Sequence, residues 1–403
     1  MEKREKKINF IILNINAYAN YSGKDMAGAM RIKNLFNPLL EKKEVSVSNL
    51  IILDLLSIEH NGRNISSNPD VDCLSIGYKS LKKPLSVIGF LRHGIRFIKD
   101  HRQKNSTNII YSYQYIDIRN FLLLLYAKLK GFKIVFDLVE DLNHLEIKSF
   151  NDRLHMKFSR FFLKLIRPYA DGIFVISNHL MKETLEITAN KIPVFMLPIS
   201  VDFKNIKTVQ QTKDADDTIK VFYGGSFAQK DGLEYLLEAV NILEKENYKF
   251  KLILSGKGEP NDMERILKKV KNKDLVDYKG FLSTEAYFDL LNNVNICCMT
   301  RNNSAFSNAG FPFKLGEFLA SGKVIIASRI GDVEKYIVHK ESAYLVTPES
   351  TADIAEGLRY CFKNLDILSQ TMGPKAKQIA LKYFNSEVSS KYMLEKCLSI
   401  CEN

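Results

Sequence analysis

Cysteine is scarce in this chain, and no long apolar run occurs. The 403 residues include six cysteines. The adjacent Cys297 and Cys298, and the pair Cys397 and Cys401 one helical turn apart, have neither the spacing of a zinc cluster nor that of a disulfide framework. No apolar run approaches the roughly 20 residues that span a bilayer. From these absences we expect reduced thiols, a cytoplasmic location and no membrane-spanning segment.

Motifs for several chemistries are also missing. The loop after the first expected strand lacks the GxGxxG fingerprint, which argues against a dinucleotide-dependent dehydrogenase. No DxD-like pair of acids is placed where it could hold a metal, so we expect no metal cofactor. The first 14 residues place basic side chains before a short apolar stretch, and we interpret this stretch as a strand rather than a signal peptide because no small-residue cleavage site follows.

The charge is strongly positive. Lys and Arg number 58 against 46 Asp and Glu, which gives a net charge of +12. Nucleic acid is the weakest explanation because basic repeats interleaved with aromatic residues do not occur. An anionic membrane surface and plain solubility remain. Residues 80–104 combine basic and apolar side chains, which fits either a basic amphipathic surface lying on lipid or an ordinary helix with its charged face in water.

The order of strand-like and helix-like runs predicts an α/β chain of two domains. At 403 residues the chain is long enough for two domains of roughly 200 residues each. Strands alternate with helices in both halves, which predicts parallel sheets with right-handed crossovers. The strands of the first half are expected at residues 8–15, 51–56, 108–113, 133–138, 172–177 and 192–197. The polar run 204–217 has the composition of an interdomain connection.

Two loops of the first half carry candidate side chains. Gly23 and Lys24 lie in the loop that follows the first strand. Asp141 lies in the polar run that follows the strand at 133–138, and the active sites of open α/β sheets lie at the carboxyl ends of strands. The alternative for this run is a polar loop that caps a helix.

The second half contains a glycine loop and a later glycine turn that suit a phosphate. Residues 224–230 follow an expected strand at 219–223 and end in Lys230, which can neutralise a diphosphate. In the later turn, Gly310 precedes Pro312, which suits a first helical position. Glu317 lies about one turn inside that helix, and Gly322 ends it. Ordinary alternatives are a solvated Lys230 and a Glu317 paired with Lys314.

These residues resemble the donor-site signature of the retaining glycosyltransferases of family 4. The match is carried by Glu317, by Leu319–Ala320–Gly322 and by the strand 324–326, and the resemblance covers most of the chain. It implies a GT-B fold of two Rossmann-like domains that face a central cleft. The expected divisions are an acceptor-binding domain at 1–203, a nucleotide-sugar-binding domain at 204–384 and a C-terminal helix at 385–403 that returns to the first domain.

The resemblance also assigns roles to individual residues. Lys230 and Asp141 are the implied catalytic residues, and Gly23 and Lys24 the implied acceptor-side loop. Glu317 would hold the ribose hydroxyls, and backbone groups near Gly280 and Phe281 would meet the base. Because Ala309 stands at the position of the family's first glutamate, the sugar would be held by backbone, by Asn308 or by Ser307. The implied donor-binding residues are Gly225, Ser226, Phe281, Asn308, Gly310, Phe311, Lys314 and Glu317.

The implied reaction moves a sugar from a nucleoside diphosphate to a hydroxyl of a glycan or a lipid-linked acceptor, without a cofactor. Surface polysaccharide or lipopolysaccharide assembly at the inner face of a membrane is the expected setting. Because of Ala309, a catalytically weak or inactive partner subunit that binds a sugar nucleotide is the alternative. A sugar-nucleotide epimerase is disfavoured because the histidines are few and unsuitably placed.

Overall fold

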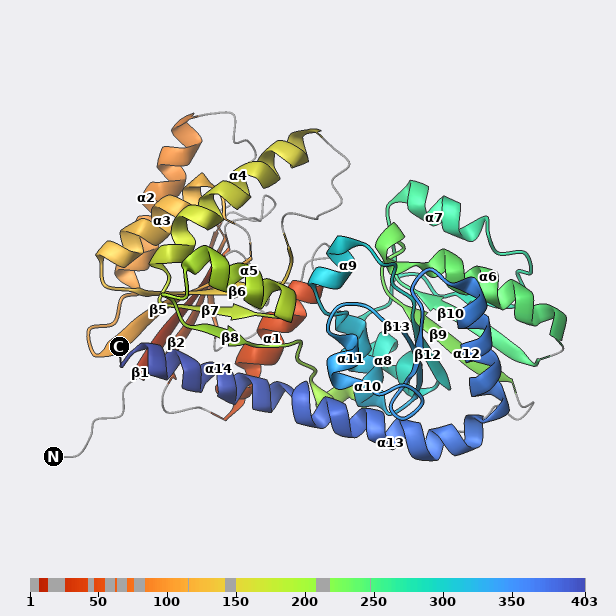
Figure 1. The fold of residues 1–403 in the computed structure, drawn as a ribbon. Coiled ribbons are helices and arrows are strands. Elements are labelled where there is room, and N and C mark those ends of the chain that lie inside the picture. Colours follow the sequence, from red (N-terminus) through yellow and green to blue (C-terminus); the bar gives the residue numbers. More distant parts are fainter. Residues whose placement is uncertain are drawn as a thin grey trace. The chain divides into compact units, whose positions relative to one another are not determined.

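The structure, a computed structural model, contains two compact units (Figure 1). One comprises Met1–Pro198 with Glu387–Asn403, and the other comprises Ile199–Ser386. The sequence predicted these divisions at 203/204 and 384/385. Among the described residues, no helix combines the length and the apolar character needed to cross a membrane. The described residues are 7–13, 26–42, 47–54, 62–63, 71–75, 84–114, 116–141, 150–207, 218–246 and 248–402.

The N-terminal unit is built on one sheet with the order β3-β4-β2-β1-β5-β6-β7-β8. Its strands pair in parallel, apart from the antiparallel pair β3 and β4. Strand β2 lies on one side of β1, and the later strands continue from β5 on its other side. The order in which strands are added therefore reverses between β1 and β5, which is the switch point of this sheet. The strands are β1 (Lys7–Leu13), β2 (Val47–Asp54), β3 (Gly62–Arg63), β4 (Asp72–Ser75), β5 (Ser106–Tyr113), β6 (Lys133–Leu138), β7 (Gly172–Val175) and β8 (Val194–Met196).

Helices cover both faces of this sheet, which explains why successive residues of β1 are buried. Ile8, Phe10 and Ile12 pack in one core with α1 and α14, while the intervening Ile11 and Leu13 are also fully buried. In Figure 1, α2, α3 and α4 lie together on the side of the sheet opposite α1 and α14. The helices are α1 (Met26–Glu41), α2 (Pro84–Asp100), α3 (Ile118–Leu129), α4 (Phe150–Ile166), η1 (Arg167–Tyr169), α5 (Asn178–Thr188) and α14 (Ser386–Ile400).

The C-terminal unit repeats this architecture with a smaller, wholly parallel sheet. Its order is β11-β10-β9-β12-β13-β14. The chain proceeds outward from β9 in one direction and from β12 in the other, so the switch point lies between β9 and β12. The strands are β9 (Ile219–Gly224), β10 (Phe250–Ser255), β11 (Val276–Tyr278), β12 (Ile296–Met299), β13 (Val324–Ser328) and β14 (Tyr344–Val346).

Apolar helix faces close both sides of this second sheet. Leu236, Leu237 and Val240 of α6 share a core with Leu358 of α12 and Met372 of α13. The other helices complete the unit. The elements are η2 (Phe203–Asn205), η3 (Gln229–Asp231), α6 (Leu233–Leu243), η4 (Glu244–Glu246), α7 (Pro260–Leu267), α8 (Thr284–Asn292), α9 (Ala305–Ala309), α10 (Phe313–Ser321), α11 (Val333–Tyr336), α12 (Thr351–Lys363) and α13 (Leu365–Tyr383).

Of the two interpretations of residues 80–104, the structure favours an ordinary helix with its charged face in water. Phe90, Phe97 and Ile98 of α2 are buried, whereas Arg92 and Arg96 are exposed. The apolar side of α2 therefore packs on the protein core, and its charged side faces water.

Candidate functional site

Two loops of the C-terminal unit start at the switch point of its sheet. One follows β9 and runs from Gly225 to η3, and the other follows β12 and runs from Thr300 to α9. Ligands of open α/β sheets bind at the carboxyl ends of the strands beside such a point. The topology therefore brings the two predicted phosphate-binding segments to the same edge of the sheet.

Glycines hold three neighbouring strand ends together at this edge. The N–H of Gly225 donates to the carbonyl of Ser255 at 3.0 Å, and the N–H of Gly256 donates to the carbonyl of Gly280 at 2.9 Å. Gly256 has φ +140, and a Cβ there would lie 1.7 Å from the oxygen of Gly225. Only glycine permits this approach, so Gly256 fixes the turn that follows β10.

Ser226 and Asp231 form a polar pair within the loop after β9. The hydroxyl of Ser226 donates to Oδ2 of Asp231, and Nε of Arg301 lies 3.3 Å from Oδ1 of the same carboxylate. Ser226 was predicted to bind donor, but here its hydroxyl is engaged by Asp231. Arg301, which sequence reasoning missed, brings a guanidinium to this loop from the segment after β12.

Lys230 is fixed between the two loops. Its carbonyl accepts a hydrogen bond of 2.9 Å from the N–H of Asn302, and its Nζ lies 4.5 Å from the ring centroid of Phe306 on α9. A cation over an aromatic face is held by electrostatic attraction to the ring. The predicted phosphate-binding lysine and the α9 segment are thus in direct contact.

Phe281 offers an exposed ring near the end of β11. About 48% of the residue is exposed, and Nζ of Lys257 lies 4.7 Å from its ring centroid. An exposed aromatic face beside a backbone edge suits the stacking of a nucleobase. The contact of this region with the base stays a prediction.

Asn308 serves as a brace for the turn in which it lies. Its amide Nδ2 donates to Oδ1 of Asn303 at 2.8 Å, and its Oδ1 accepts the N–H of Gly331 at 2.8 Å. The side chain thereby links α9 to the loop after β13. The neighbouring Ala309 is 1% exposed, so the alanine that replaces the family's glutamate packs into the protein.

The two residues before Pro312 differ from expectation. Gly310 is extended, with φ −110 and ψ −168, so the turn does not depend on glycine there. The Phe311 ring is buried, with centroids 5.6 Å from Tyr336 and 5.3 Å from Phe384. Pro312 caps α10 rather than beginning it.

Glu317 and Lys314 form an ion pair on the first turns of α10. Nζ of Lys314 lies 2.9 Å from Oε2 of Glu317 and 3.7 Å from the ring centroid of Tyr287. Glu317 is 3% exposed. Burial and the nearby Glu317 carboxylate raise the pKa of Tyr287 well above its ordinary value. The pairing that the sequence offered as the ordinary alternative is the one present, and a buried carboxylate with two acceptor oxygens stands at the predicted diol-binding position.

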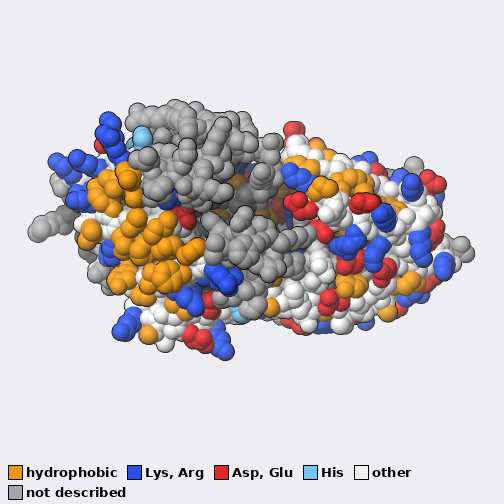
Figure 2. Space-filling model, turned by 90° about the horizontal axis from the view of Figure 1, so that it is seen from above, with side chains coloured by type: hydrophobic (Ala, Val, Ile, Leu, Met, Phe, Trp, Pro, Cys, Tyr) orange, Lys and Arg blue, Asp and Glu red, His pale blue; other side chains and the backbone are white. Residues whose placement is uncertain are grey.

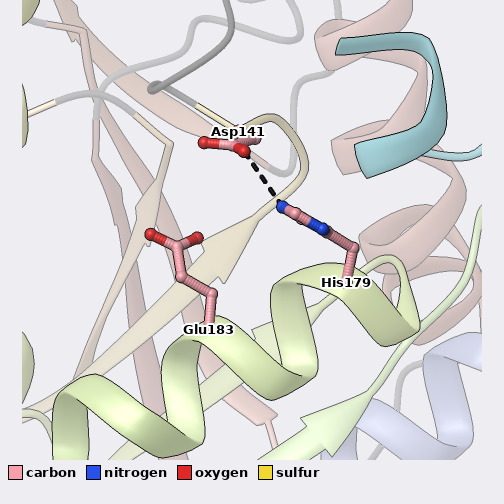
Figure 3. A group of neighbouring side chains, drawn as sticks. All are labelled: Asp141, His179 and Glu183. Carbon is pink, nitrogen blue, oxygen red and sulfur yellow. Dashed lines mark hydrogen bonds and ion pairs between the residues drawn. The ribbon is translucent and has the colours of Figure 1, made fainter. Parts of the chain in front are cut away.

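A separate cluster lies at the carboxyl ends of β6 and β7 in the N-terminal unit. Figure 3 shows Asp141 directed at His179, with Glu183 on the same face of α5. Nε2 of His179 lies 3.0 Å from Oδ2 of Asp141, which is 2% exposed. Nη1 of Arg167 lies 3.7 Å from Oε1 of Glu183, and burial lowers the pKa of Arg167 while Glu183 and Asp141 raise it.

The ligand atoms of Asp141, His179 and Glu183 lie within 4.8 Å of one another, a spacing at which they could hold a metal ion. The Arg167 guanidinium already supplies positive charge to these carboxylates. We read the cluster as a histidine oriented by a buried acid rather than as a metal centre. The absence of a metal stays a prediction.

Gln114 supports the backbone that carries Asp141. Its side-chain Oε1 accepts the N–H groups of Val139 at 2.7 Å and Glu140 at 3.1 Å, and its Nε2 donates to the carbonyl of Glu140 at 2.9 Å. Gln114 itself has φ +52, a conformation that is uncommon outside glycine. The predicted acceptor-side residues Gly23 and Lys24 lie outside the described residues.

A comparison with known families decides the class of the C-terminal unit. Residues 205–379 match the model of the family described as glycosyl transferases group 1. This segment is a group 1 glycosyltransferase domain. The predicted family is thereby confirmed at the level of group 1, and the match covers the two switch-point loops, Phe281 and α10.

Curated relatives agree with this class, and solved structures agree with the fold. Two uncharacterized glycosyltransferases of Methanocaldococcus jannaschii are 23% and 22% identical over 60% and 59% of this chain. The matches cover 62% and 60% of those relatives. Sucrose-phosphate synthase from Thermosynechococcus elongatus aligns with a TM-score of 0.75 at 14% identity over 98% of this chain and 100% of that one. Anabaena HepE, solved with UDP and glucose, aligns with a TM-score of 0.69 at 13% identity over the same shares. The predicted GT-B fold class is confirmed.

The sequence had no means to find several residues of the group 1 domain and its partner unit. Arg301 lies 70 positions after Asp231 in the sequence, and only the switch-point topology joins them. His179 follows the cap residue Ser177 and reads as an ordinary surface histidine. Its spacing from Glu183, four residues apart on one helix face, was the one available signal.

Proposed function

We propose that this chain is a retaining glycosyltransferase that moves a sugar from a nucleoside-diphosphate sugar to a hydroxyl of a glycan or lipid-linked acceptor. The observation that carries the proposal is the group 1 domain with its cationic loops at the sheet's switch point. HepE was solved with UDP-glucose, which supports a nucleotide sugar as donor here. Assembly of surface polysaccharide or lipopolysaccharide, at the cytoplasmic face of a membrane, is the setting we propose.

The donor's diphosphate is the group that most needs stabilisation, because negative charge develops on it as the glycosidic bond breaks. We assign this task to Lys230, with Arg301 as a second cation on the adjacent loop and the N–H groups of Gly310 and Phe311 beside α10. Gly225 permits close approach of backbone, and no metal is required.

The nucleoside would be held at the other strand ends. Phe281 offers a face for the base, and the buried Glu317 would accept hydrogen bonds from the two ribose hydroxyls while Lys314 balances its charge. The charge-assisted hydrogen bond from Lys314, at 2.9 Å, orients the Glu317 carboxylate.

On the acceptor side we propose Asp141 and His179 as the polar pair that meets the acceptor hydroxyl. His179 is about half exposed, and its Nε2 faces the buried Asp141 carboxylate. Retention by same-face attack lets the leaving phosphate take the acceptor's proton. The pair would therefore position the hydroxyl, and no strong side-chain base is needed.

One observation favours a second candidate, a sugar-nucleotide-binding partner with weak or no turnover. The buried Ala309 stands where the family's first glutamate would contact the transferred sugar. The two candidates share the nucleotide site and differ in turnover.

A thermal-shift screen against UDP, GDP, ADP and CMP tests the nucleotide site. We expect a rise of several degrees with one diphosphate, its loss in Glu317→Ala, and its retention in Glu264→Ala, a control that removes an exposed glutamate paired with Lys268 on α7. No shift with any nucleotide would overturn both candidates. Hydrolysis of the matching nucleotide sugar without acceptor then separates the enzyme from the inactive partner.

A further inference from the structure

The outer surface of α3 and α4 exposes large apolar side chains. Leu129 is 86% exposed, and Phe158 and Phe161 are 54% and 55% exposed. Scattered single apolar residues are normal on a protein surface, but a continuous group on neighbouring helices is not. We call this surface the α3–α4 face, and its members are Ile118, Leu122, Leu129, Phe158, Phe161, Leu165 and Tyr169.

The spacing shows that these residues form stripes along the helices. Phe158, Phe161 and Leu165 follow one another at intervals of three and four on α4, and Tyr169 continues the row on η1. The opposite side of α4 is occupied by the buried Leu163 and Ile166. A helix that only needs to cover a sheet would carry polar side chains on its outer face. Apolar residues on both faces indicate that the outer face also meets an apolar medium.

The two helices present their apolar stripes as one surface. The rings of Phe121 on α3 and Phe162 on α4 lie 5.3 Å apart, which places the helices side by side. Figure 2 shows a broad hydrophobic patch on the N-terminal unit with Lys and Arg side chains at its edges. Ile88 of the neighbouring helix α2 is also exposed.

Basic side chains predominate around this surface. Residues 157–165 contain Lys157, Arg160 and Lys164 and no acidic residue. On α2, Arg92, Arg96 and Lys99 add further positive charge, and Asp100 is 3.6 Å from Arg96 in an ion pair. Aromatic and aliphatic side chains rimmed by lysine and arginine suit the boundary between acyl chains and anionic headgroups.

We propose that the α3–α4 face docks this protein on an anionic lipid bilayer. The occupant is a bilayer rather than a second copy, because a two-fold contact would bring the same basic rims together. The proposal builds on the proposed function, in which a lipid-linked acceptor places the reaction at a membrane. The proposal assigns the contact with the bilayer to α3 and α4. The basic stretch at 80–104 contributes only the exposed side chains of α2.

Vesicle flotation of the full chain tests the proposal. The variant Phe158→Ser with Phe161→Ser removes two exposed rings, and the matched control, Ile367→Ser with Val338→Ser, removes two comparably exposed apolar side chains from the other unit. We expect wild type and control to float with vesicles that contain about 30% phosphatidylglycerol, and the Phe158/Phe161 variant to bind about tenfold more weakly. Binding should fall with added salt and with phosphatidylcholine alone.

Several outcomes would overturn the proposal. They are equal flotation of the Phe158/Phe161 variant and the control, no flotation of the wild type, or a wild-type dimer that this variant dissociates. Nucleotide thermal shifts measured on the same variants keep the two proposals apart. If the wild type shows a nucleotide-induced thermal shift but does not float, the docking face alone is overturned. If the wild type shows no thermal shift with any nucleotide, the proposed function is overturned.

Discussion

Gly256 has a backbone conformation that residues with side chains rarely adopt, and it also lies against Gly225 of the loop after β9. At φ +140, its hypothetical Cβ would lie 1.7 Å from the Gly225 oxygen. Gly280 has φ +69 but nothing within 4 Å of its Cβ position. The two glycines therefore separate the cost of a clash from that of backbone conformation.

We predict that Gly256→Ala lowers the free energy of unfolding by at least about 3 kcal/mol, because the backbone must move away from Gly225. Gly280→Ala should cost about 1–2 kcal/mol, the penalty of a left-handed conformation alone. Urea unfolding measures both values. Equal losses in the two variants would contradict the assignment of a clash to Gly256.

Arg31 and Asp137 form a buried ion pair in the N-terminal unit. Nε and Nη2 of Arg31 donate to the two carboxylate oxygens of Asp137, both at 2.7 Å. Burial lowers the pKa of Arg31 but Asp137 raises it, and the net direction is upward. Arg31 also donates to the carbonyls of Leu197 and Pro198, so it ties α1 to the segment after β8.

We expect Arg31→Met to cost about 3–5 kcal/mol of unfolding free energy, because it leaves the Asp137 carboxylate buried without its cation. The double variant Arg31→Met with Asp137→Leu should recover part of that loss. Chemical denaturation of the single and double variants measures the coupling. If the loss of unfolding free energy in the double variant equals the sum of the losses in the two single variants, Arg31 and Asp137 contribute to stability independently of each other.

His339 gives the C-terminal unit a pH dependence. Its Nδ1 accepts the N–H of Leu345 at 3.0 Å, which requires the neutral ring nitrogen there. Burial, Arg329 and Lys340 lower the pKa of His339 below the ordinary 6.5. The folded state thus binds fewer protons than the unfolded state, so its contribution is present above about pH 6.5 and is lost as the pH falls toward the folded pKa.

We predict that His339→Asn reduces the fall in melting temperature between about pH 7 and pH 5, because the amide oxygen accepts from Leu345 at either pH. The control is His93→Asn, which alters an exposed histidine on α2. A wild-type slope retained in His339→Asn would assign the pH dependence to other groups.

Single residues of the donor site were predictable where local geometry decides them. Gly322 ends α10 with φ +68, as the helix pattern implied. Gly310 was wrong as a turn residue, because its backbone is extended, and the Phe311 ring contacts Tyr336 and Phe384, which lie far along the sequence. Local signals report backbone needs, whereas side-chain partners depend on the tertiary fold.

At the scale of elements, β6 was predicted with its observed bounds, Lys133–Leu138, because a short run rich in β-branched and aromatic residues is typical of a buried strand. Helix α13 (Leu365–Tyr383) continues through Pro374. Proline ordinarily marks a helix boundary, and here packing on the core overrides it. The five-residue α9 has no periodicity to reveal it.

The side chain of Gln114, which follows β5, holds the backbone of the loop after β6. We predict that Gln114→Ala lowers kcat/KM for sugar transfer by about tenfold or more, because Val139 and Glu140 lose their acceptor and Asp141 is no longer held. The nucleotide-induced thermal shift should persist, since that site belongs to the group 1 domain. Gln114→Glu keeps the acceptor and serves as the conservative control. A loss of nucleotide binding in Gln114→Ala would contradict a local role.

At the scale of the whole molecule, the chain leaves the N-terminal unit at Pro198 and re-enters it at Glu387. Helix α14 supplies side chains to the core of β1, β5 and α1, at spacings of four and three residues: Met393, Cys397 and Ile400. The Ser390 hydroxyl donates to the carbonyl of Leu35 at 2.6 Å. Alternation of strands and helices predicted two α/β units, but only the resemblance predicted the return of the last helix, because an amphipathic helix does not specify its partner.

Deletion of residues 387–403 should therefore unfold the N-terminal unit and spare the other. Four buried side chains, the three above and Leu394, contribute about 1.5–3 kcal/mol each, which together rivals the 5–15 kcal/mol stability of a typical domain. Calorimetry should show one transition instead of two, and a nucleotide that binds the group 1 domain should still raise the remaining one. A control truncation after Cys401 keeps all four side chains and should retain both transitions. Two transitions in the longer deletion would contradict this prediction, because they would mean that the N-terminal sheet is stable without α14.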